Sequence, residues 1–235
     1  MRGSVSYISF TFLVLSASAQ THFNQQLKQK LDSMQALDQK YRIPLALSSN
    51  GKDDSLAAAY GIKKEELTNY LWKLQNENDS LNILRIEEII ETYGYPGSTL
   101  VGTPTNEAAF YIIQHSKVID KYLPTIENAA ERKELDFQLY AMMLDRSLMF
   151  KNKEQIYGTQ LSGVSVKNAA TAQWETIMFI WPISDPLTVN ERRKKAGFTQ
   201  TVEEYASEGG IDYRVFTLKQ VLQMRQEVMR AYEHK

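Results

Sequence analysis

Apolar residues recur at intervals of three and four positions along most of this sequence, a spacing that is typical of amphipathic helices. The first stripe occupies residues 23–42 and consists of Phe23, Leu27, Leu31, Met34, Leu37 and Tyr41. Further stripes predict helices over residues 67–74, over residues 81–93, and from the capping pair Thr103-Pro104 to His115. Pro44 is expected to end the first helix, and the turn-forming residues 45–54 predict a loop. The chain is therefore expected to fold mainly from helices.

One helical segment is apolar around almost its whole circumference. It covers residues 135–150 and follows a helix expected from Pro124 to Arg132. A helix of this kind usually lies at the centre of its domain, because it has no face to present to water. The residues of this segment that we expect to be buried are Leu139, Met142, Met143 and Leu148.

The only clear β signal lies in residues 157–181. Residues 157–166 and the run Ile177-Met178-Phe179-Ile180-Trp181 favour the two strands of a hairpin. Helices are expected again over residues 190–196, whose basic run 192–195 suggests a solvated face, after the capping box of Thr201 and Glu204, and over residues 217–232. The predicted fold is mainly α (α+β), with about eight helices packed around residues 135–150 and one β-hairpin.

The first nineteen residues carry the three parts of a secretory signal peptide. Arg2 gives the positive start, residues 5–15 form a short apolar core, and Ala17-Ser18-Ala19 places small residues at the cleavage site. A membrane anchor is the alternative, but the apolar run is shorter than the roughly 20 residues that span a bilayer, and serines interrupt it. We expect cleavage after Ala19, so that the mature protein begins at Gln20 and is secreted or periplasmic.

The sequence contains no cysteine. Lipid attachment at a new N-terminal cysteine, disulfides and thiolate metal sites are therefore excluded, and packing alone must stabilise the fold in an oxidising compartment. Removal of residues 1–19 leaves 216 residues, so residues 20–235 are expected to form a single helical domain. The formal charge of −1 gives no basic surface for nucleic acid or for an anionic membrane, and we expect neither partner.

The sequence lacks the motifs of the common enzyme classes. It has no Gly-rich phosphate loop, no His-Glu-x-x-His, no Gly-x-Ser-x-Gly and no dinucleotide fingerprint. We therefore expect no cofactor. Two of the three histidines, His22 and His234, lie near the ends of the mature chain. A structural metal site needs several His or Cys ligands, so we expect none.

His115 is the one histidine in the middle of the sequence. It falls on the line of Ala108, Ile112 and Ile119, so its side chain is expected to point with apolar residues toward the core. One interpretation is a buried neutral imidazole that hydrogen-bonds to backbone or to a carboxylate. The other is a general base or a ligand-binding group near neutral pH.

Asp145 and Arg146 interrupt the most apolar helix. Adjacent residues of a helix do not face each other, so each needs a partner from another element. A structural ion-pair network and a ligand site both explain them. Elsewhere, Asp38 and Arg42 have the i, i+4 spacing of an exposed helix salt bridge. The segment Tyr157-Gly158-Thr159-Gln160 is either a pocket rim or an ordinary turn.

The candidate residues belong to a series of short motifs. They are Asp38-Gln39-x-x-Arg42, Gly94-Tyr95-Pro96, Gln114-His115, Leu123-Pro124, Asp145-Arg146, Tyr157-Gly158-Thr159-Gln160, and Asp185-Pro186 followed by Arg192-Arg193. In this order the motifs resemble a family of bacterial proteins with a domain of unknown function, many of them exported. The similarity covers roughly residues 30–200, with Tyr95 where tryptophan is more usual. The family has no assigned activity, so the resemblance implies a shared domain and no mechanism.

Three classes of function remain open. The leading hypothesis is an exported binding domain with a polar pocket for a small anionic ligand, lined by Asp38, Arg42, Gln114, Arg146, Tyr157 and Gln160. The second is a metal-independent hydrolase or lyase with His115 as general base, Asp145 as the carboxylate that orients it, and Arg42 or Arg146 stabilising charge. The third is a structural or protein-interaction module of the cell envelope, whose protein partner the sequence does not identify. The side chains expected to meet around one concave site are Arg42, His115, Asp145, Arg146 and Gln160.

Overall fold

The computed structural model describes residues 22–48, 53–167, 171 and 173–233. The predicted signal peptide, its cleavage site after Ala19 and the new N-terminus at Gln20 lie outside these residues. The elements follow in the order α1 (Gln25–Gln39), α2 (Arg42–Ser48), α3 (Asp53–Tyr60), α4 (Lys64–Tyr93), α5 (Ser98–Val101), η1 (Thr105–Glu107), α6 (Ala108–Gln114), α7 (Ile119–Glu131), α8 (Phe137–Phe150), β1 (Leu161–Lys167), β2 (Trp174–Ile180), η2 (Pro186–Thr188), α9 (Val189–Lys195), α10 (Val202–Glu208) and α11 (Leu218–Glu233). The predicted fold class is confirmed: the protein is mainly helical, with an antiparallel hairpin of two strands.

The long helix α4 replaces the two helices expected over residues 67–74 and 81–93. The polar residues 75–80 suggest a break in the sequence, but Gln75 and Asn82 continue the buried face of the helix. Their amide groups donate hydrogen bonds to the carbonyl oxygens of Asp38 and Met34 on α1. In residues 75–82, hydrogen bonds to α1 take the place of apolar contacts. The buried face of α4 therefore continues through these polar residues without a break.

Two prolines lie inside helices rather than at their ends. Pro44 is the third residue of α2, where the missing amide N–H costs no helical hydrogen bond. The loop expected over residues 45–54 is therefore wrong in part, because α2 continues to Ser48 and α3 begins at Asp53. Pro124 lies within α7 rather than at its start, because the helix begins five residues earlier, at the buried Ile119. The helix expected from Thr103-Pro104 begins only after η1, as α6.

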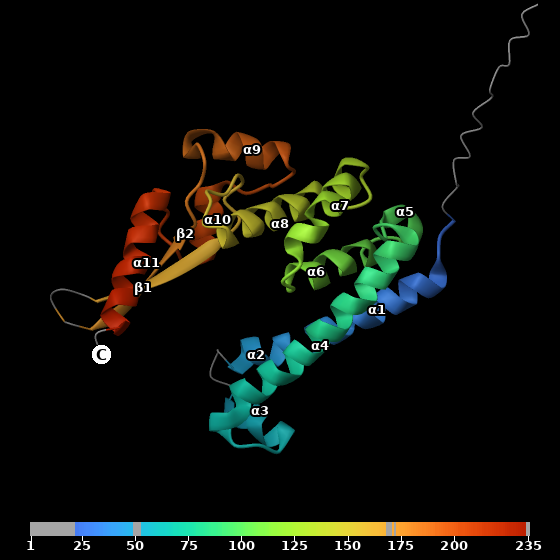
Figure 1. Cartoon of the computed structure of the whole chain (residues 1–235), viewed down its shortest axis with the longest axis horizontal. Coiled ribbons are helices and arrows are strands. Elements are labelled where there is room, and N and C mark those ends of the chain that lie inside the picture. The colour runs from blue at the N-terminus through green and yellow to red at the C-terminus, as the bar shows by residue number, and fades with distance from the viewer. Residues whose placement is uncertain (1–21, 49–52, 168–170, 172, 234–235) are drawn as a thin grey trace, which may run out of the picture.

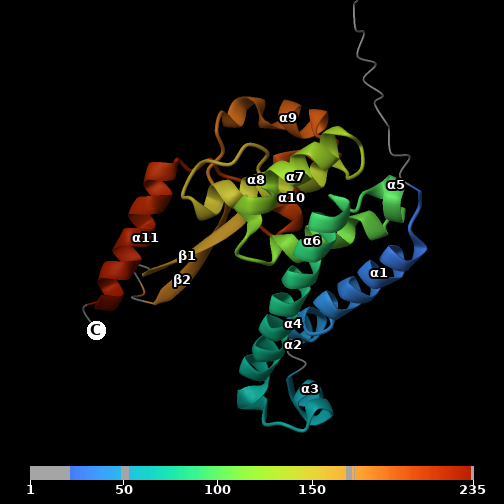
Figure 2. The same cartoon turned by 45° about the vertical axis from the view of Figure 1, so that its right-hand side comes forward.

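The main hydrophobic core lies where α1, α4, α6, α7 and α8 meet (Figures 1 and 2). The most completely buried of these helices is α6, in which Ala108, Phe110 and Ile113 have no exposed surface. It contacts α1, α4 and α7. The last residues of α6 are therefore carried into the middle of the helical core.

The helix expected at the centre, α8, packs along α7 and buries one side. Leu139 and Met143 are buried as predicted, whereas Met142 and Leu148 are only half-buried. Met142 packs at the edge of the main core, and Leu148 lies near the C-terminal end of α8, where Phe150 is 65% exposed. The large-to-small penalty expected at Leu148 is correspondingly smaller.

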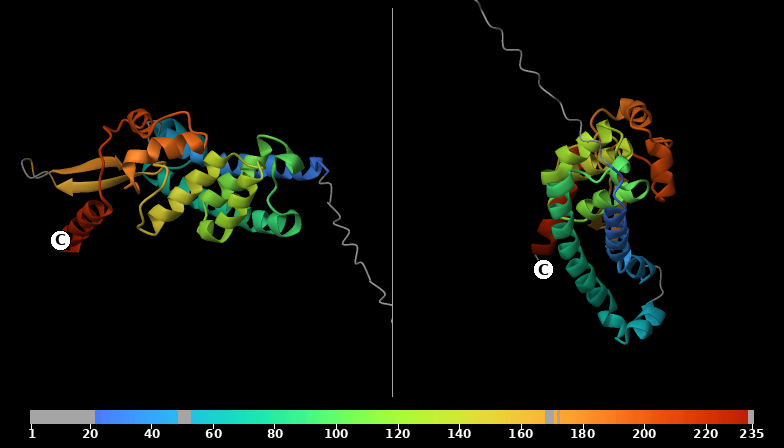
Figure 3. Two further views of the ribbon diagram at one scale, coloured as in Figure 1. Left: turned by 90° about the horizontal axis from the view of Figure 1, so that it is seen from above. Right: turned by 90° about the vertical axis from the view of Figure 1, so that its right-hand side faces the viewer.

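The hairpin projects at the end of the molecule away from α1 and α5 (Figure 3). Its strands pair from Leu161 opposite Ile180 to Lys167 opposite Trp174. Helix α11 packs against β1, and Ile180 joins apolar residues of α9 and α10 in a smaller cluster. Residues 151–160 thus connect the helical core to the hairpin. Within the described ranges, every helix is too short or too polar to cross a membrane.

Candidate functional site

Asp38 is the last buried residue on the apolar stripe of α1. It follows Leu31 and Met34 at helical spacing, so its carboxylate enters the contact of α1 with α4 and α6. Arg42 Nη2 lies 3.4 Å from Asp38 Oδ1, and the aspartate side chain is only 1% exposed. The i, i+4 pair is therefore present, but it is not the solvent-exposed salt bridge that its spacing suggests.

His115 is the second side chain that contacts Asp38 Oδ1. The residue caps the C-terminus of α6, and its Nδ1 lies 3.3 Å from Asp38 Oδ1. Burial raises the pKa of Asp38, but the hydrogen bond and charge of His115, followed by the charge of Arg42, outweigh it and hold the pKa below its ordinary value. The side chain of His115 is 20% exposed. The imidazole is therefore half-buried at the edge of the core, with its Nδ1 against an ionised carboxylate.

Gln75 and Asp79 of α4 complete this cluster, and the sequence analysis did not include them. Asp79 Oδ1 lies 2.7 Å from Arg42 Nη2. Gln75 Nε2 donates to Asp79 Oδ1 at 2.7 Å and to the carbonyl of Asp38 at 3.0 Å. Gln75 could have been identified in the same way as His115, because it is a polar residue at helical spacing from apolar residues, here Leu67 and Leu71. Asp79 has no such signal, because only the packing of α4 against α1 and α2 brings it to Arg42.

Arg146 of α8 lies beside this cluster and has neutral hydrogen-bond partners. Its Nη1 donates to the carbonyl of Gln114 at 3.2 Å, and its Nε donates to Gln160 Oε1 at 3.3 Å. Among the described residues, no carboxylate forms an ion pair with it and its Nη2 has no hydrogen-bond partner. Burial, and then the like charge of Arg42, lower the pKa of Arg146. Gln114 contributes through its backbone rather than through the side chain that we expected.

Hydrogen bonds fix the side chain of Gln160 so that its Oε1 faces Arg146. Its Nε2 donates to the carbonyl of Met142 at 3.2 Å and to Thr159 Oγ1 at 3.1 Å, which leaves Oε1 to accept from Arg146. Gln160 is 6% exposed. The predicted contact between residues of α8 and the start of the hairpin is therefore formed by Arg146 and Gln160.

Asp145 serves a different purpose from its neighbour. Its carboxylate has no exposed surface and accepts hydrogen bonds from the backbone amides of Ile156, Tyr157 and Thr159 and from Thr159 Oγ1, at 2.7 to 3.1 Å. Burial raises the pKa of Asp145 in spite of these hydrogen bonds. Tyr157 contributes its amide here, while its ring packs near Phe137 with centroids 6.4 Å apart. Asp145 thus anchors the loop that presents Gln160.

A buried arginine of α9 holds the same loop from its other side. Arg193 Nη1 donates to the carbonyl of Tyr157 at 2.9 Å, and the guanidinium lies between the rings of Phe198 and Tyr205. Its exposed fraction is 1%. The solvated face expected for the basic run 192–195 is therefore wrong at Arg193, which is buried. The loop of residues 156–160 is therefore held on one side by the carboxylate of Asp145, which binds its amides, and on the other by Arg193, which binds the carbonyl of Tyr157.

The five residues expected to meet around one concave site form two groups of contacts. His115 and Arg42 both contact Asp38, and Arg146 contacts Gln160 and the carbonyl of Gln114, the residue before His115. Asp145 joins the second group only through Thr159. The structure corrects the role that we expected for Asp145, because Asp38 is the carboxylate that contacts His115. Arg146 can attract an anion, because its partners are neutral, whereas Asp38 and Asp79 offset the charge of Arg42. The Asp38–His115 pair can orient a general base.

The described part of the chain holds no group of three or more His, Asp or Glu side chains arranged to bind a metal ion.

The family model described as "Family of unknown function (DUF6624)" matches residues 25–213, from the start of α1 to the connection before α11. The chain belongs to this family. Comparison with curated proteins gives no match, and neither does comparison with solved structures.

Proposed function

We propose that this family member is an exported binding domain whose ligand is a small anion, bound by Arg146 beside His115 and Arg42. The protein would act in the periplasm or outside the cell, after removal of residues 1–19. The sequence at the N-terminus supports the location, and the charge balance around Arg146 supports the ligand class.

The observation that carries the proposal is the unpaired charge of Arg146. A guanidinium removed from water is costly unless a counter-charge offsets the loss, and here the described partners are two neutral oxygens. The neighbouring charge of Arg42 adds repulsion and lowers the pKa of Arg146. An anion that accepts from the free Nη2 of Arg146 would remove both penalties. A planar guanidinium suits the oxygens of a carboxylate or phosphate.

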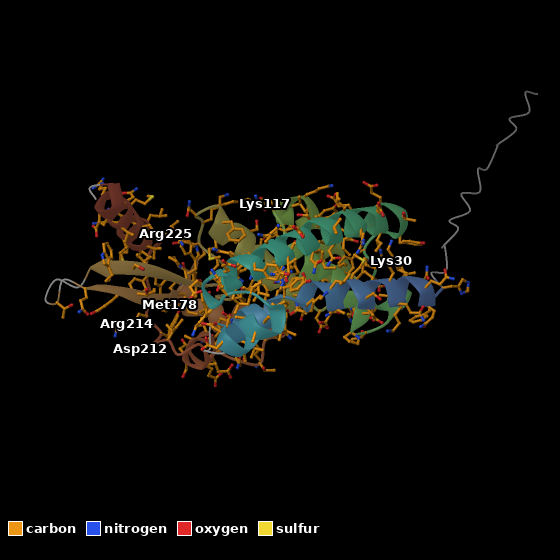
Figure 4. All side chains as sticks on the ribbon, turned by 90° about the horizontal axis from the view of Figure 1, so that it is seen from below. Lys30, Lys117, Met178, Asp212, Arg214 and Arg225 are labelled. Atoms are coloured by element: carbon orange, nitrogen blue, oxygen red, sulfur yellow. The ribbon has the colours of Figure 1, made fainter. Side chains whose placement is uncertain are left out.

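The experiment compares the thermal unfolding of three proteins in phosphate, sulfate or chloride at equal ionic strength. They are the wild type, Arg146→Gln, and Arg214→Gln as the matched surface control. Arg214 is 72% exposed, pairs with Asp212, and lies at the hairpin end of the molecule with Met178 (Figure 4). Phosphate or sulfate should raise the midpoint of the wild type and of Arg214→Gln but not of Arg146→Gln, because an anion that binds the folded state stabilises it. An equal response of all three proteins would contradict the proposal.

The Asp38–His115 pair supports a second candidate, a metal-independent hydrolase or lyase. A buried ionised carboxylate 3.3 Å from Nδ1 holds that nitrogen as the protonated one, which leaves Nε2 as a base. Arg146 or Arg42 would then stabilise the developing negative charge. The two candidates share one site and differ in whether the bound anion reacts.

Substitution of Asp38 separates these candidates. Asp38→Asn removes the charge that orients the imidazole but leaves Arg42 more strongly positive, so phosphate binding should be kept or tightened. Turnover of p-nitrophenyl phosphate or p-nitrophenyl acetate, if the wild type shows any, should fall about 100-fold or more, the usual share of a general base. Loss of phosphate binding in Asp38→Asn would contradict the binding proposal. Loss of stability alone in His115→Asn would favour the structural module of the envelope.

A further inference from the structure

A cavity of about 460 Å³ lies at the other end of α4 from the cluster of Asp38 and Arg146. Asp79 and the start of the cavity at Tyr93 are fourteen residues apart on one helix, which is about 21 Å. The lining of this cavity includes none of the sequence-predicted site residues. It does include Gly94 and Tyr95 of the motif Gly94-Tyr95-Pro96, which takes no part in the proposed anion site. The size is within the range of small-molecule pockets.

Three elements form the walls of this cavity. The exit of α4 contributes Tyr93 and Tyr95, and α5 contributes Thr99 and Leu100. One face of α7 and the residue that caps it contribute Thr125, Asn128, Ala129 and Arg132 at helical spacing. Aromatic and aliphatic surface therefore alternates with polar groups, as in sites that hold a partly apolar small molecule.

Glu134 provides the negative charge of the cavity, and the backbone around it is fixed. Its Oε2 accepts from the amide of Thr99 at 2.8 Å and from Ser98 Oγ at 3.3 Å, and its carbonyl accepts from Asn106 Nδ2 at 2.8 Å. A Cβ on Gly97 would lie 2.4 Å from the Cβ of Glu134, so only glycine allows this approach. Burial raises the pKa of Glu134, but the hydrogen bonds from Thr99 and Ser98 and the charge of Arg132 lower it below its ordinary value. The carboxylate is therefore ionised and preformed.

Arg132 provides the positive charge of the same cavity. Its charge acts on Glu134, yet the hydrogen bonds of the glutamate side chain go to Ser98 and Thr99, through Oε2. Within the described part of the chain, Oε1 of Glu134 and the exposed guanidinium of Arg132 have no hydrogen-bond partner, so both are available to a third group. A purely anionic ligand would meet Glu134, and a purely cationic one would meet Arg132. A molecule with both charges satisfies both side chains.

We propose that this cavity is a second binding site, for a zwitterion of the amino acid or dipeptide class. The ammonium group of the ligand pairs with Glu134, its carboxylate pairs with Arg132, and its apolar part lies against Leu100, Ala129 and the ring of Tyr93. The site is independent of the anion proposed to bind at Arg146.

Isothermal titration calorimetry tests this proposal on the mature protein with four probes: leucine, leucyl-leucine, N-acetyl-leucine and leucine methyl ester. The last two lack the ammonium group and the carboxylate respectively. Leucine or leucyl-leucine should bind, and each blocked compound should bind about 10-fold more weakly or not at all, because each loses one charge-assisted contact. Failure of both zwitterions to bind at about 10 mM, where even millimolar affinity would be seen, would overturn the proposal.

Variants locate the binding. Glu134→Gln keeps an oxygen for the amide of Thr99, so it should fold and bind the zwitterion about 10-fold more weakly or not at all. Glu131→Gln, an exposed neighbour on α7 that does not line the cavity, is the matched control and should bind like the wild type. Should Glu134→Gln fail to unfold cooperatively, Thr125→Phe fills the cavity from α7 and should also abolish binding. Unchanged binding in either cavity variant would overturn the proposal, and Arg146→Gln should have no effect on it.

Discussion

Asp38 and Asp145 are both fully buried, yet their pKa values move in opposite directions. Asp38 has charged partners, His115 and Arg42, and these outweigh the burial that raises its pKa. Asp145 has only neutral donors, three backbone amides and a hydroxyl, and burial prevails. The difference shows which network can respond to a ligand. Around Asp38 the charges reach the surface at Arg42 and His115, whereas Asp145 and its loop form a closed anchor.

The largest effect is expected for Asp145→Asn. An amide in place of the carboxylate points an N–H group at backbone N–H donors, so several buried groups lose their acceptor. The free energy of unfolding should fall by about 3 to 5 kcal/mol. Urea denaturation measures it, with Asp212→Asn as the control, since Asp212 is 80% exposed and should change stability little. A loss for Asp145→Asn that is no larger than that of the control would refute the anchoring role.

A smaller loss is expected for Asp38→Asn, about 1 to 2 kcal/mol. Asparagine Oδ1 still accepts a hydrogen bond from Arg42. The change removes the attraction between charges and the oxygen that accepts from Gln39 Nε2 at 2.7 Å. The same urea experiment measures this loss. If Asp38→Asn were as destabilising as Asp145→Asn, the distinction between a responsive network and an anchor would fail.

The contribution of Asp38 to stability should depend on pH. Its folded pKa lies below the unfolded value of about 3.9, so ionised Asp38 stabilises the protein above that pH. The contribution is lost as the pH falls through the folded pKa. The difference in unfolding free energy between wild type and Asp38→Asn should therefore shrink between about pH 5 and pH 3. A difference that becomes larger over this interval would contradict the lowered pKa of Asp38.

The smallest effect on stability is expected for Arg146→Met. Removal of a guanidinium that lacks a counter-charge is favourable, but Gln160 Oε1 loses its donor. The two effects should nearly cancel and change the unfolding free energy by no more than about 1 kcal/mol in the absence of bound anion. Added phosphate should then stabilise the wild type and not the variant. A loss of more than about 2 kcal/mol would instead identify Arg146 as a structural residue.

Helical periodicity located most of the fold, because apolar stripes such as that of α1 and the capping box at Thr201 depend on neighbouring residues. It failed in the middle of α4, where Gln75 is buried by polar contacts with α1 rather than by apolar ones. It also left α2 and α3 unpredicted, since seven- and eight-residue helices show too little of a stripe to be recognised.

Sequence reasoning identified the site residues that interrupt an apolar stripe. His115, Asp145 and Arg146 were found in this way, and each was expected to have a hydrogen-bond partner, because buried polar groups need one. The partners themselves could not be predicted. Which aspartate contacts His115 depends on how α1 crosses α6, and Arg193 lies in a basic run that gives no sign of its burial.

A small anion is proposed to bind at Arg146, whose Nη1 contacts the carbonyl of Gln114 next to His115, and the ring resonances of histidine test this binding most directly. The chain has three histidines, and the exposed His22 serves as an internal control for general effects of salt. On titration with phosphate at constant pH and ionic strength, the proposed site predicts saturable shifts of the His115 resonances in the wild type. It predicts no such shifts in Arg146→Gln. Resonances of His115 that stay still, or that move equally in both proteins, would contradict the claim.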